Sequence, residues 1–580
     1  MNVSAISHRS LFTDCYARDP RNLTVNIRTG KDVRGVNLMF DDPYAYGIAG
    51  GFQWKGKPQP MELRRELKHH YIWSATVTPE HRRMQYCFEV FGQDEQLILC
   101  EDGLYPPETL KKAGRLLQYF KFPYINACDV IAPPAWVEDT VWYQIMPDRF
   151  CKGGDHPKRM KLKDWEDREH ITGADFFGGD LKGITQKLPY IKDLGISGIY
   201  LLPIFDSDTN HKYNTFDYKR IDPDFGTEED LRELVATAHS LGIRVMLDAV
   251  FNHSGTEFAP WKDVWEKGEE SPYFSWFCIH DKNFPRNFAS LRDGRYDGFA
   301  FLPHMPKLDT GNPQVQAYFG DICTYWVKHW GVDGIRFDVG NEVSHSFLKY
   351  MNRTLKAHNP EVFLLGEIWM DSAQWLMGDE YDSVMNYPYV ESLQNFWVDK
   401  DATSRDLMYA LERVYSLYPE QINRVAFNHL DTHDTMRALN RCGSLDTFYQ
   451  QLTMLLTMPG SPCIYYGTEI AMPGGNDPDC RRTMPWDKIE KGEFACHQAL
   501  TKALIALRNQ YRQLKGERIC WLHDDAHPRL IAYDRPGETK TIRVYLNATE
   551  EAIPVKANPL FAYKYEEEYL NAGGILVCAL

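Results

Sequence analysis

Eight short apolar runs between residues 141 and 466 constrain the fold of this chain more than any other feature. Several of the segments between them, such as LPYIKDLG and EDLRELVATAHSLG, repeat apolar residues at helical spacing and end in glycine. Strands that alternate with helices predict an α/β fold with a parallel sheet, and eight strands fit one closed (β/α)8 TIM barrel. The runs are VWYQIM (141–146), GISGIYLLPIF (195–205), IRVMLDAVF (243–251), GIRFDV (334–339), FLLGEI (363–368), SVMNY (383–387), RVAFNHL (424–430) and SPCIYY (461–466).

A doubly wound open sheet is the competing α/β arrangement. That fold commonly carries G-x-G-x-x-G where the first strand turns into a helix, and no such motif occurs near residue 146. The strand count also favours the barrel. One connection breaks the regular alternation, because residues 252–308 are rich in aromatic and turn-forming residues, and we predict that they form a subdomain inserted after the third strand.

The segments on either side of the barrel have short alternating patterns that are typical of antiparallel sheets. We predict an N-terminal β-sandwich over residues 1–125, in which Leu23 to Ile27, Ile72 to Val77 and Gln85 to Phe91 are strands. The proline-containing run VIAPPAWVEDT then links it to a barrel domain at 132–515. Residues 516–580 predict a small C-terminal β-sandwich.

Composition excludes several classes of function. A net charge of -15 gives no basic footprint for a nucleic acid, and no run is apolar and long enough to span a membrane. The first residues lack the pattern of a secretory signal, and the 13 cysteines show no metal-ligand spacing. We therefore expect a reduced, cytoplasmic protein with no nucleic-acid or membrane partner.

Ionisable residues follow four of the predicted strands, at the end of a TIM barrel where chemistry takes place. A single carboxylate there could equally cap a helix or pair with a loop cation. Four such strand ends together predict an active site. The residues are Asp248 and His253, Arg336 and Asp338, Glu367, and Asp431, His433 and Asp434.

Arg336 and Asp338 are two residues apart on one strand, so their side chains point to the same face. We expect the guanidinium to lower the pKa of Asp338 and keep it ionised as a nucleophile, while nearby anions raise the pKa of Glu367 and make it an acid. Retaining glycosidases divide the work of two carboxylates in this way. Asp434 would then hold the reacting sugar in a distorted shape.

Other chemistries remain to be weighed against this one. His253 and His433 beside carboxylates could mark a metal site, although neither lies in a close-spaced ligand motif. Serine chemistry is disfavoured because the chain has no G-x-S-x-G elbow. A binding protein that had lost turnover would usually lack one of the three carboxylates, and all three are present.

At this point the chain resembles the alpha-amylase superfamily, and within it the neopullulanase, cyclomaltodextrinase and maltogenic amylase branch. The resemblance covers about residues 138 to 487. The matching motifs are VWYQIMPDRF, FFGGDLKGI, NHKYNTFDYKRIDPDFGT, LDAVFNHSG, MPKLDTGNPQV, GVDGIRFDVGNEVSH, GEIW, LDTHDT and GSPCIYYGTEIAMPGGNDPDCRR.

The resemblance implies that Asp338, Glu367 and Asp434 are the catalytic residues. It implies hydrolysis of alpha-1,4 bonds in cyclodextrins, maltooligosaccharides and pullulan with some transglycosylation, and leaves an alpha-1,6-acting or branching relative as the rival. It also assigns a set of substrate-binding residues, in which Trp369 is an acceptor-side platform unless it is a packed core residue. These are Tyr213, His253, Arg336, Trp369, His433, Asp477 and Arg481.

The branch further implies a homodimer, in which the N-terminal domain narrows the active-site cleft of the partner. No cofactor is expected to be required. Gly178 and Asp180 match part of the calcium site of relatives, but the segment FCKGGD after Arg149 lacks the asparagine that completes it. The chain also departs from the branch at three positions near the site, where it has Asn214, Asp309 and Met370.

Overall fold

The computed structural model describes residues 1–48, 54, 56–111, 118–281, 291–292 and 294–580. The chain folds into two compact units. The first contains Met1–Ala132 with Asp401–Asn423, and the second contains Pro133–Lys400 with Arg424–Leu580.

The N-terminal unit is built on two antiparallel sheets. One has the strand order β1-β2-β6-β5, the other β4-β3-β7-β8-β9, and β10 pairs with β7. Apolar side chains from both sheets, including those of Leu23, Trp73 and Phe88, form a single buried core. The strands are β1 Cys15–Ala17, β2 Leu23–Gly30, β3 Gly35–Asp41, β4 Lys57–Pro60, β5 Glu62–Glu66, β6 His70–Val77, β7 Met84–Phe91, β8 Gln96–Cys100, β9 Gly103–Tyr105 and β10 Phe120–Phe122.

Helix α8 (Ser404–Tyr415) belongs to the same unit, although its sequence lies between two barrel strands. Its capping box, formed by Thr403 and Asp406, fixes its start. Glu412 on this helix forms a buried ion pair with Arg65 of β5, with 2.9 Å between Oε2 and Nη1. Because both side chains are buried, replacing only one of them would leave an unpaired buried charge and destabilise the fold.

The second unit contains the predicted barrel, and all eight predicted strands are present. The parallel sheet has the order β18-β17-β16-β15-β12-β11-β20-β19, and a parallel bridge between Met385 and Phe427 joins its two ends. The sheet is thus closed, as the strand count predicted. The strands are β11 Trp142–Ile145, β12 Gly198–Leu201, β15 Arg244–Ala249, β16 Gly334–Phe337, β17 Phe363–Gly366, β18 Ser383–Val384, β19 Phe427–His429 and β20 Ser461–Tyr465.

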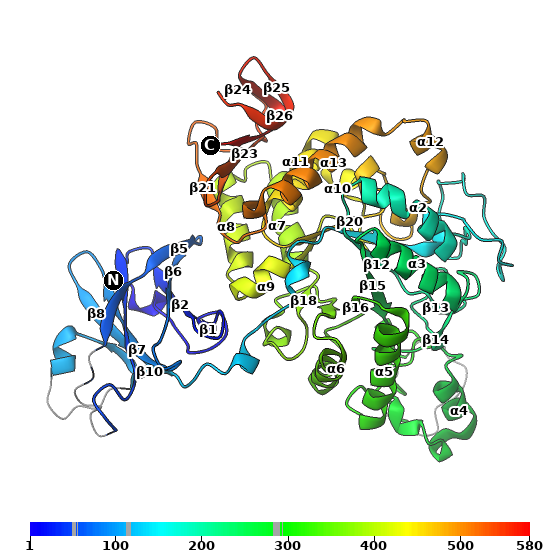
Figure 1. The fold of residues 1–580 in the computed structure, drawn as a ribbon, viewed down its shortest axis with the longest axis horizontal. Coiled ribbons are helices and arrows are strands. Elements are labelled where there is room, and N and C mark those ends of the chain that lie inside the picture. Colours follow the sequence, from blue (N-terminus) through cyan, green and yellow to red (C-terminus); the bar gives the residue numbers. More distant parts are fainter. Residues whose placement is uncertain (49–53, 55, 112–117, 282–290, 293) are drawn as a thin grey trace. The chain divides into compact units, whose positions relative to one another are not determined.

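Helices surround this sheet in Figure 1. Five of those described, α2, α3, α5, α6 and α11, begin at a side-chain cap. Asp180 caps α2 by accepting the Gly183 N–H, and Thr227 and Asp230 form a capping box at α3. The helices of the unit are α1 Pro147–Phe150, α2 Leu181–Asp193, α3 Glu228–Ser240, α5 Pro313–Tyr325, α6 His345–His358, α7 Tyr387–Val398, α10 Ala438–Cys442, α11 Leu445–Thr457, α12 Trp486–Glu490 and α13 Ala495–Gln510, while α9 (Glu420–Val425) crosses the boundary between the units.

Two further parts complete the second unit. The insertion after the third strand carries α4 (Ala259–Lys267) and packs around Trp261, whose ring lies 4.8 Å from that of Phe277 and 5.0 Å from that of Tyr296. Its residues 282–290 and 293 lie outside the described residues. The C-terminal segment forms an antiparallel sheet. Its strands are β21 Cys520–Leu522, β22 Leu530–Pro536, β23 Thr541–Asn547, β24 Ile553–Pro554, β25 Pro559–Glu566 and β26 Tyr569–Ala579.

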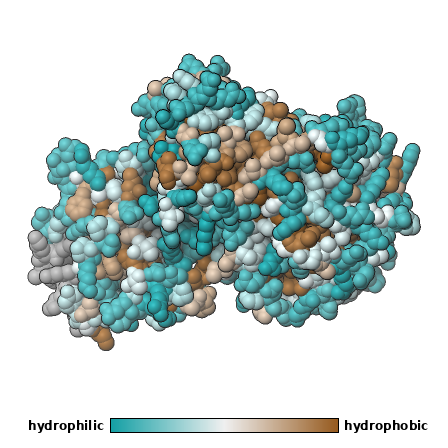
Figure 2. Space-filling model, turned by 45° about the horizontal axis from the view of Figure 1, so that its top comes forward, coloured by the Kyte–Doolittle hydropathy of each residue, from teal (hydrophilic) through white to brown (hydrophobic). Residues whose placement is uncertain are grey.

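The part of the chain that the structure describes has no helix long and apolar enough to cross a membrane. The face drawn in Figure 2 is mainly hydrophilic, with smaller hydrophobic areas between.

A buried histidine of the barrel makes stability depend on pH. Burial, together with a smaller effect of Arg441, lowers the pKa of His429 on β19 to about 3. Its ring nitrogens have no hydrogen-bond partner within the described residues. Because the pKa in the unfolded chain is higher, near 6.5, the folded state loses stability as pH falls from 6.5 toward 3, by about 2 kcal/mol at pH 5.

We therefore expect His429→Leu to reduce the fall in melting temperature between pH 7.5 and pH 5, measured by differential scanning calorimetry. His358→Leu, at an exposed histidine, is the control. It should show the same fall in melting temperature as the unmodified protein. An equal fall in all three proteins would contradict the assignment.

Candidate active site

A cavity of about 660 Å³ opens at the carboxyl ends of the barrel strands. Nine of the ten predicted catalytic and substrate-binding residues line it, and the tenth, Arg336, lies beneath them. The structure therefore brings together side chains that are up to 268 residues apart in the sequence, from Tyr213 to Arg481. The lining residues are Gly173, His211, Tyr213, His253, Phe299, Leu302, Met305, Asp338, Val339, Asn341, Glu342, Glu367, Trp369, His433, Asp434, Asp477, Pro478 and Arg481.

Arg336 is the centre of the charge arrangement. Its side chain is 0% exposed, and its Nη1 lies 3.0 Å from Asp248 Oδ1 and 2.8 Å from Asp338 Oδ1. Its Nη2 lies 2.9 Å from Glu367 Oε2. Strand register explains this, because Asp248 on β15 and Arg336 on β16 are direct partners. One guanidinium thus fixes carboxylates that follow or lie on three neighbouring strands.

Glu367 has a different donor at each oxygen. The backbone N–H of Val339 donates to Oε2 at 2.9 Å, and the indole Nε1 of Trp369 donates to Oε1 at 3.1 Å. The Trp369 ring stacks on Tyr387, with 3.8 Å between centroids and 12° between planes. Trp369 is 44% exposed and lines the cavity, so it is not a packed core residue.

Asp434 also lines the cavity, and nitrogen atoms of Arg481 and His433 lie close to its carboxylate. Arg481 Nη2 is 3.3 Å from its Oδ1, and His433 Nε2 is 3.2 Å from its Oδ2. Arg481 also pairs with Asp477 at 3.1 Å and donates to the His433 carbonyl. Asp434, Asp477 and Arg481 therefore form one connected group.

Tyr213 and His433 form a parallel pair, with ring planes only 6° apart. Gln144 Nε2 lies 2.9 Å from His433 Nδ1, which therefore accepts, so Nε2 carries the hydrogen toward Tyr213 Oη at 2.7 Å. The Tyr213 hydroxyl donates in turn to Asp248 Oδ2 at 2.9 Å. Burial holds the pKa of His433 well below its usual range, so this ring is neutral.

His253 is likewise held as a neutral hydrogen-bond donor. Its Nε2 lies 3.0 Å from the Tyr213 carbonyl oxygen, and its ring stacks on Phe299. Burial lowers the pKa of His253 to about 3. The same cause lowers the pKa of His211, which lines the cavity beside Tyr213, to about 3.

The expected direction of the Asp338 pKa was wrong. Arg336 does lower it, but burial raises it more, and Glu367, Asp248 and Asp434 add to the rise, so that the pKa lies well above its usual range. Burial also raises the pKa of Asp434, with Arg481 opposing. Asp338 and Asp434 therefore retain their protons to higher pH than exposed aspartates would.

Sequence reasoning missed several residues of the site. Gln144, which contacts His433, is a polar residue in the apolar run VWYQIM, and that contrast was a usable signal. Phe299, Leu302 and Met305 come from the insertion, where no periodicity identifies the residues that face the barrel. His211 lies two residues before Tyr213 and could have been found from that spacing.

Not every residue that the sequence singled out reaches the cavity. Asp431 accepts from Thr468 Oγ1 and from the Ala438 N–H at the start of α10, which is a structural task. Asn214 is buried and accepts from Ser207 and Thr209 within its own loop. Asp309 accepts from the Gly311 N–H, and Met370 is exposed.

Gly178 and Asp180 also lie outside the cavity, and their contacts do not fit a calcium ion. The buried Asp180 carboxylate accepts N–H groups from Gly153 at 3.1 Å, Gly154 at 2.9 Å and Gly183 at 2.8 Å. Calcium needs several oxygen ligands, and these donors direct hydrogens at the oxygens instead. In the described ranges, no group of three or more His, Cys, Asp or Glu is placed to hold a metal, around His253 and His433 included.

Comparisons with known proteins agree with this fold. Residues 144–520 match the family model described as alpha amylase, catalytic domain, and residues 1–126 match the alpha amylase N-terminal ig-like domain. This chain belongs to the alpha-amylase family. The recognition made from sequence motifs is thereby confirmed.

Similar proteins cover nearly the whole chain. A cyclomaltodextrinase from Geobacillus thermopakistaniensis (strain MAS1) is 42% identical over 558 residues, which are 96% of this chain and 92% of the relative. An intracellular maltogenic amylase from Bacillus subtilis is 40% identical, covering 94% and 91%. A solved cyclomaltodextrinase structure has a TM-score of 0.88 at 34% identity and covers 100% of this chain and 98% of that one.

The shared guanidinium gives a direct prediction. Arg336 uses two nitrogens of a planar guanidinium, one for Asp248 and Asp338 and the other for Glu367, and a single lysine ammonium cannot reproduce this geometry. Arg336→Lys should therefore lower kcat/KM by about 100-fold or more on any hydrolysed alpha-glucan. Arg543→Lys is the matched control, since Arg543 pairs with Asp534 in the C-terminal sheet. Circular dichroism verifies folding; an Arg336→Lys enzyme within tenfold of the unmodified one would refute the role.

Proposed function

We propose that this alpha-amylase family enzyme is a retaining glycoside hydrolase of alpha-1,4-glucosidic bonds in cyclodextrins, maltooligosaccharides and pullulan, with transglycosylation as a side reaction. One observation carries the proposal: Asp338 and Glu367 are held by the same buried guanidinium at a cavity that also contains Asp434. Two carboxylates that differ in their donors can take the two different roles that retention requires.

The first step requires Asp338 to be ionised and Glu367 to be protonated. One oxygen of the Asp338 carboxylate attacks the anomeric carbon and forms a glycosyl ester. The bond from that carbon to the glycosidic oxygen breaks, and the oxygen takes the proton of Glu367. In the second step Glu367 removes a proton from water, whose oxygen attacks the same carbon and releases Asp338. A sugar hydroxyl in place of water gives transglycosylation.

The contacts of Glu367 indicate which oxygen carries the reactive proton. Its Oε2 already accepts from Val339 and lies against Arg336, so no proton is accommodated there. The proton therefore belongs on Oε1, beside the indole of Trp369. We propose that an acceptor sugar on Trp369 receives this oxygen's proton.

The remaining cavity residues suit the binding of one distorted glucose ring. The Tyr213 ring offers an apolar face to the sugar. The single N–H of neutral His253 donates to the Tyr213 carbonyl and that of neutral His433 points toward the Tyr213 hydroxyl, so both histidines position Tyr213 for that contact. Asp434 accepts hydroxyl hydrogens as the ring flattens, while Asp477 and Arg481 contact the donor side further along. These roles keep both histidines uncharged throughout the reaction.

The relatives support the substrate class and two further proposals. Names such as cyclomaltodextrinase and intracellular maltogenic amylase favour short or cyclic maltodextrins as substrates and a cytoplasmic location. The matched N-terminal domain favours a homodimer, whose neighbouring subunit would narrow access for bulky starch. We propose that no cofactor is required.

Two displacements at the anomeric carbon keep its configuration. Proton NMR during hydrolysis of maltotriose should therefore show the alpha anomer before mutarotation, and Asp338→Asn should reduce turnover by about 10⁴-fold or more. Tyr143→Phe, outside the cavity lining, serves as the control for a buried substitution. A beta anomer first, or turnover that persists in Asp338→Asn, would exclude this role for Asp338.

A side-by-side rate measurement identifies the linkage and the preferred substrate. We expect rapid opening of beta-cyclodextrin, slower attack on starch, and panose as the product of pullulan. Maltotriose as the sole pullulan product would show an alpha-1,6-acting enzyme instead. No reducing sugar from any alpha-glucan would favour a binding protein.

A further inference from the structure

Two adjacent cations, Lys158 and Arg159, follow the first barrel strand and enter a region rich in aspartates. Lys158 Nζ lies 3.4 Å from Asp180 Oδ2 and donates to the backbone oxygen of Asp224. The Lys158 side chain is only 12% exposed, and Asp180 is fully buried. This lysine therefore places its charge against an aspartate that relatives are expected to use for calcium.

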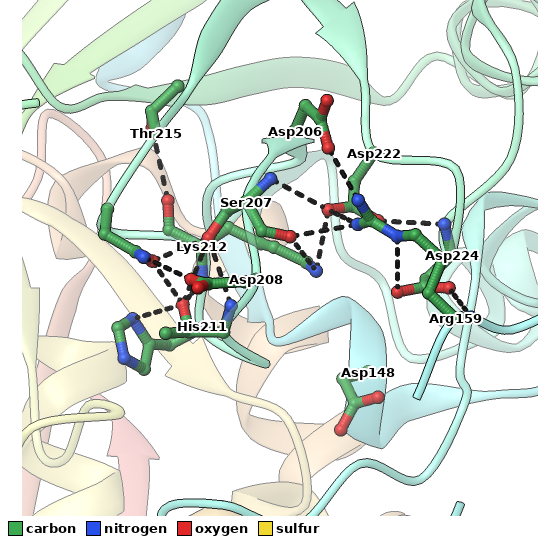
Figure 3. A network of polar contacts seen from close by, with 12 residues as sticks. Asp148, Arg159, Asp206, Ser207, Asp208, His211, Lys212, Thr215, Asp222 and Asp224 are labelled. Carbon is green, nitrogen blue, oxygen red and sulfur yellow. Dashed lines mark hydrogen bonds and ion pairs between the residues drawn. The ribbon is translucent and has the colours of Figure 1, made fainter. Parts of the chain in front are cut away.

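Arg159 makes a larger set of contacts on the neighbouring turn. Its guanidinium lies 2.9 Å from Asp206 Oδ1, 2.6 Å from Asp222 Oδ2 and 3.3 Å from Asp224 Oδ2. Its backbone N–H donates to Asp224 Oδ1, and its Nη2 donates to the Ser207 carbonyl. Figure 3 shows these aspartates arranged around the Arg159 side chain.

The network continues from Arg159 toward the cavity. Asp222 Oδ2 is shared with Lys212 Nζ, at 2.7 Å, and both of these side chains are almost completely buried (Figure 3). The backbone of Lys212 has φ of 63°. This left-handed conformation is uncommon for residues other than glycine, so contacts of the surrounding residues must stabilise it. Lys212 lies between His211 and Tyr213, which line the cavity. Fixing Lys212 thus fixes the backbone that presents Tyr213.

We propose that Lys158 and Arg159 are a built-in cation tether that replaces calcium in this chain and positions the Tyr213 loop. A calcium ion would join acidic groups from several segments through its charge. Here an ammonium joins α2, through Asp180, to the turn at Asp224, and the adjacent guanidinium joins that turn to residues 206 and 207. Lys158 and Arg159 touch no reacting atom and are positioning residues.

The tether has one consequence for stability and one for substrate binding. Stability of the enzyme should not respond to calcium, because the positive charge is covalently attached. Loss of Arg159 should loosen the presentation of Tyr213 and raise KM while kcat, set by Asp338 and Glu367, changes less. The KM part rests on the proposed function, whereas the stability part does not.

The full-length protein tests the first part without turnover. Its melting temperature should be the same in EDTA and in millimolar CaCl2, and calorimetric titration with CaCl2 should show no binding. Lys158→Met should lower the melting temperature by about 2 to 5 °C, with Lys158→Arg restoring most of it. Lys161→Met, an exposed lysine of the same segment, is the control and should change nothing.

For the second part, Arg159→Met should raise KM for maltotriose about fivefold or more and change kcat less than twofold. The proposal is overturned if calcium binds the unmodified protein or if EDTA lowers its melting temperature. It is also overturned if Lys158→Met has the same melting temperature as the Lys161→Met control. An unchanged KM in Arg159→Met removes the positioning role. Loss of all turnover in the unmodified enzyme would instead count against the proposed function and leave the melting and titration results standing.

Discussion

The buried guanidinium of Arg336 is the interaction on which the site depends. A cation that is fully removed from water is tolerated only when counter-charges surround it, and here three carboxylates do so. They can converge because β15, β16 and β17 pair side by side in the barrel, with Asp248 opposite Arg336. Pairing of these strands therefore also brings the three carboxylates together.

Around Arg336, hydrogen bonds and ion pairs fix the positions of the other site residues. Gln144 sets the tautomer of His433, which orients Tyr213, and Arg481 pairs with Asp434. The loops that carry these residues have little regular structure, so internal ion pairs fix them. The tether through Lys158 and Arg159 serves this purpose for the loop of Tyr213.

Much of this could be predicted from the sequence, because strand periodicity and chemical type are local properties. The eight barrel strands were found as apolar runs, and the ionisable residues at their ends identified five of the nine predicted cavity residues. The other four, Tyr213, Trp369, Asp477 and Arg481, were identified only through the family resemblance. The Asp338 pKa was not predictable, since burial and three neighbouring carboxylates outweigh Arg336 and none of these is visible in one strand. Phe299 and Met305 were missed because the insertion that carries them has no periodicity that identifies the residues facing the barrel.

The central claim is that Asp338 is the group that forms a bond to sugar. Mass spectrometry of peptides from the Glu367→Gln enzyme, after incubation with a fluorinated alpha-glucosyl fluoride, tests it most directly. We predict one glucosyl ester, located on Asp338 in the strand sequence GIRFDVG. An ester on Asp434 or Asp248, or turnover with no covalent species at all, would contradict the account.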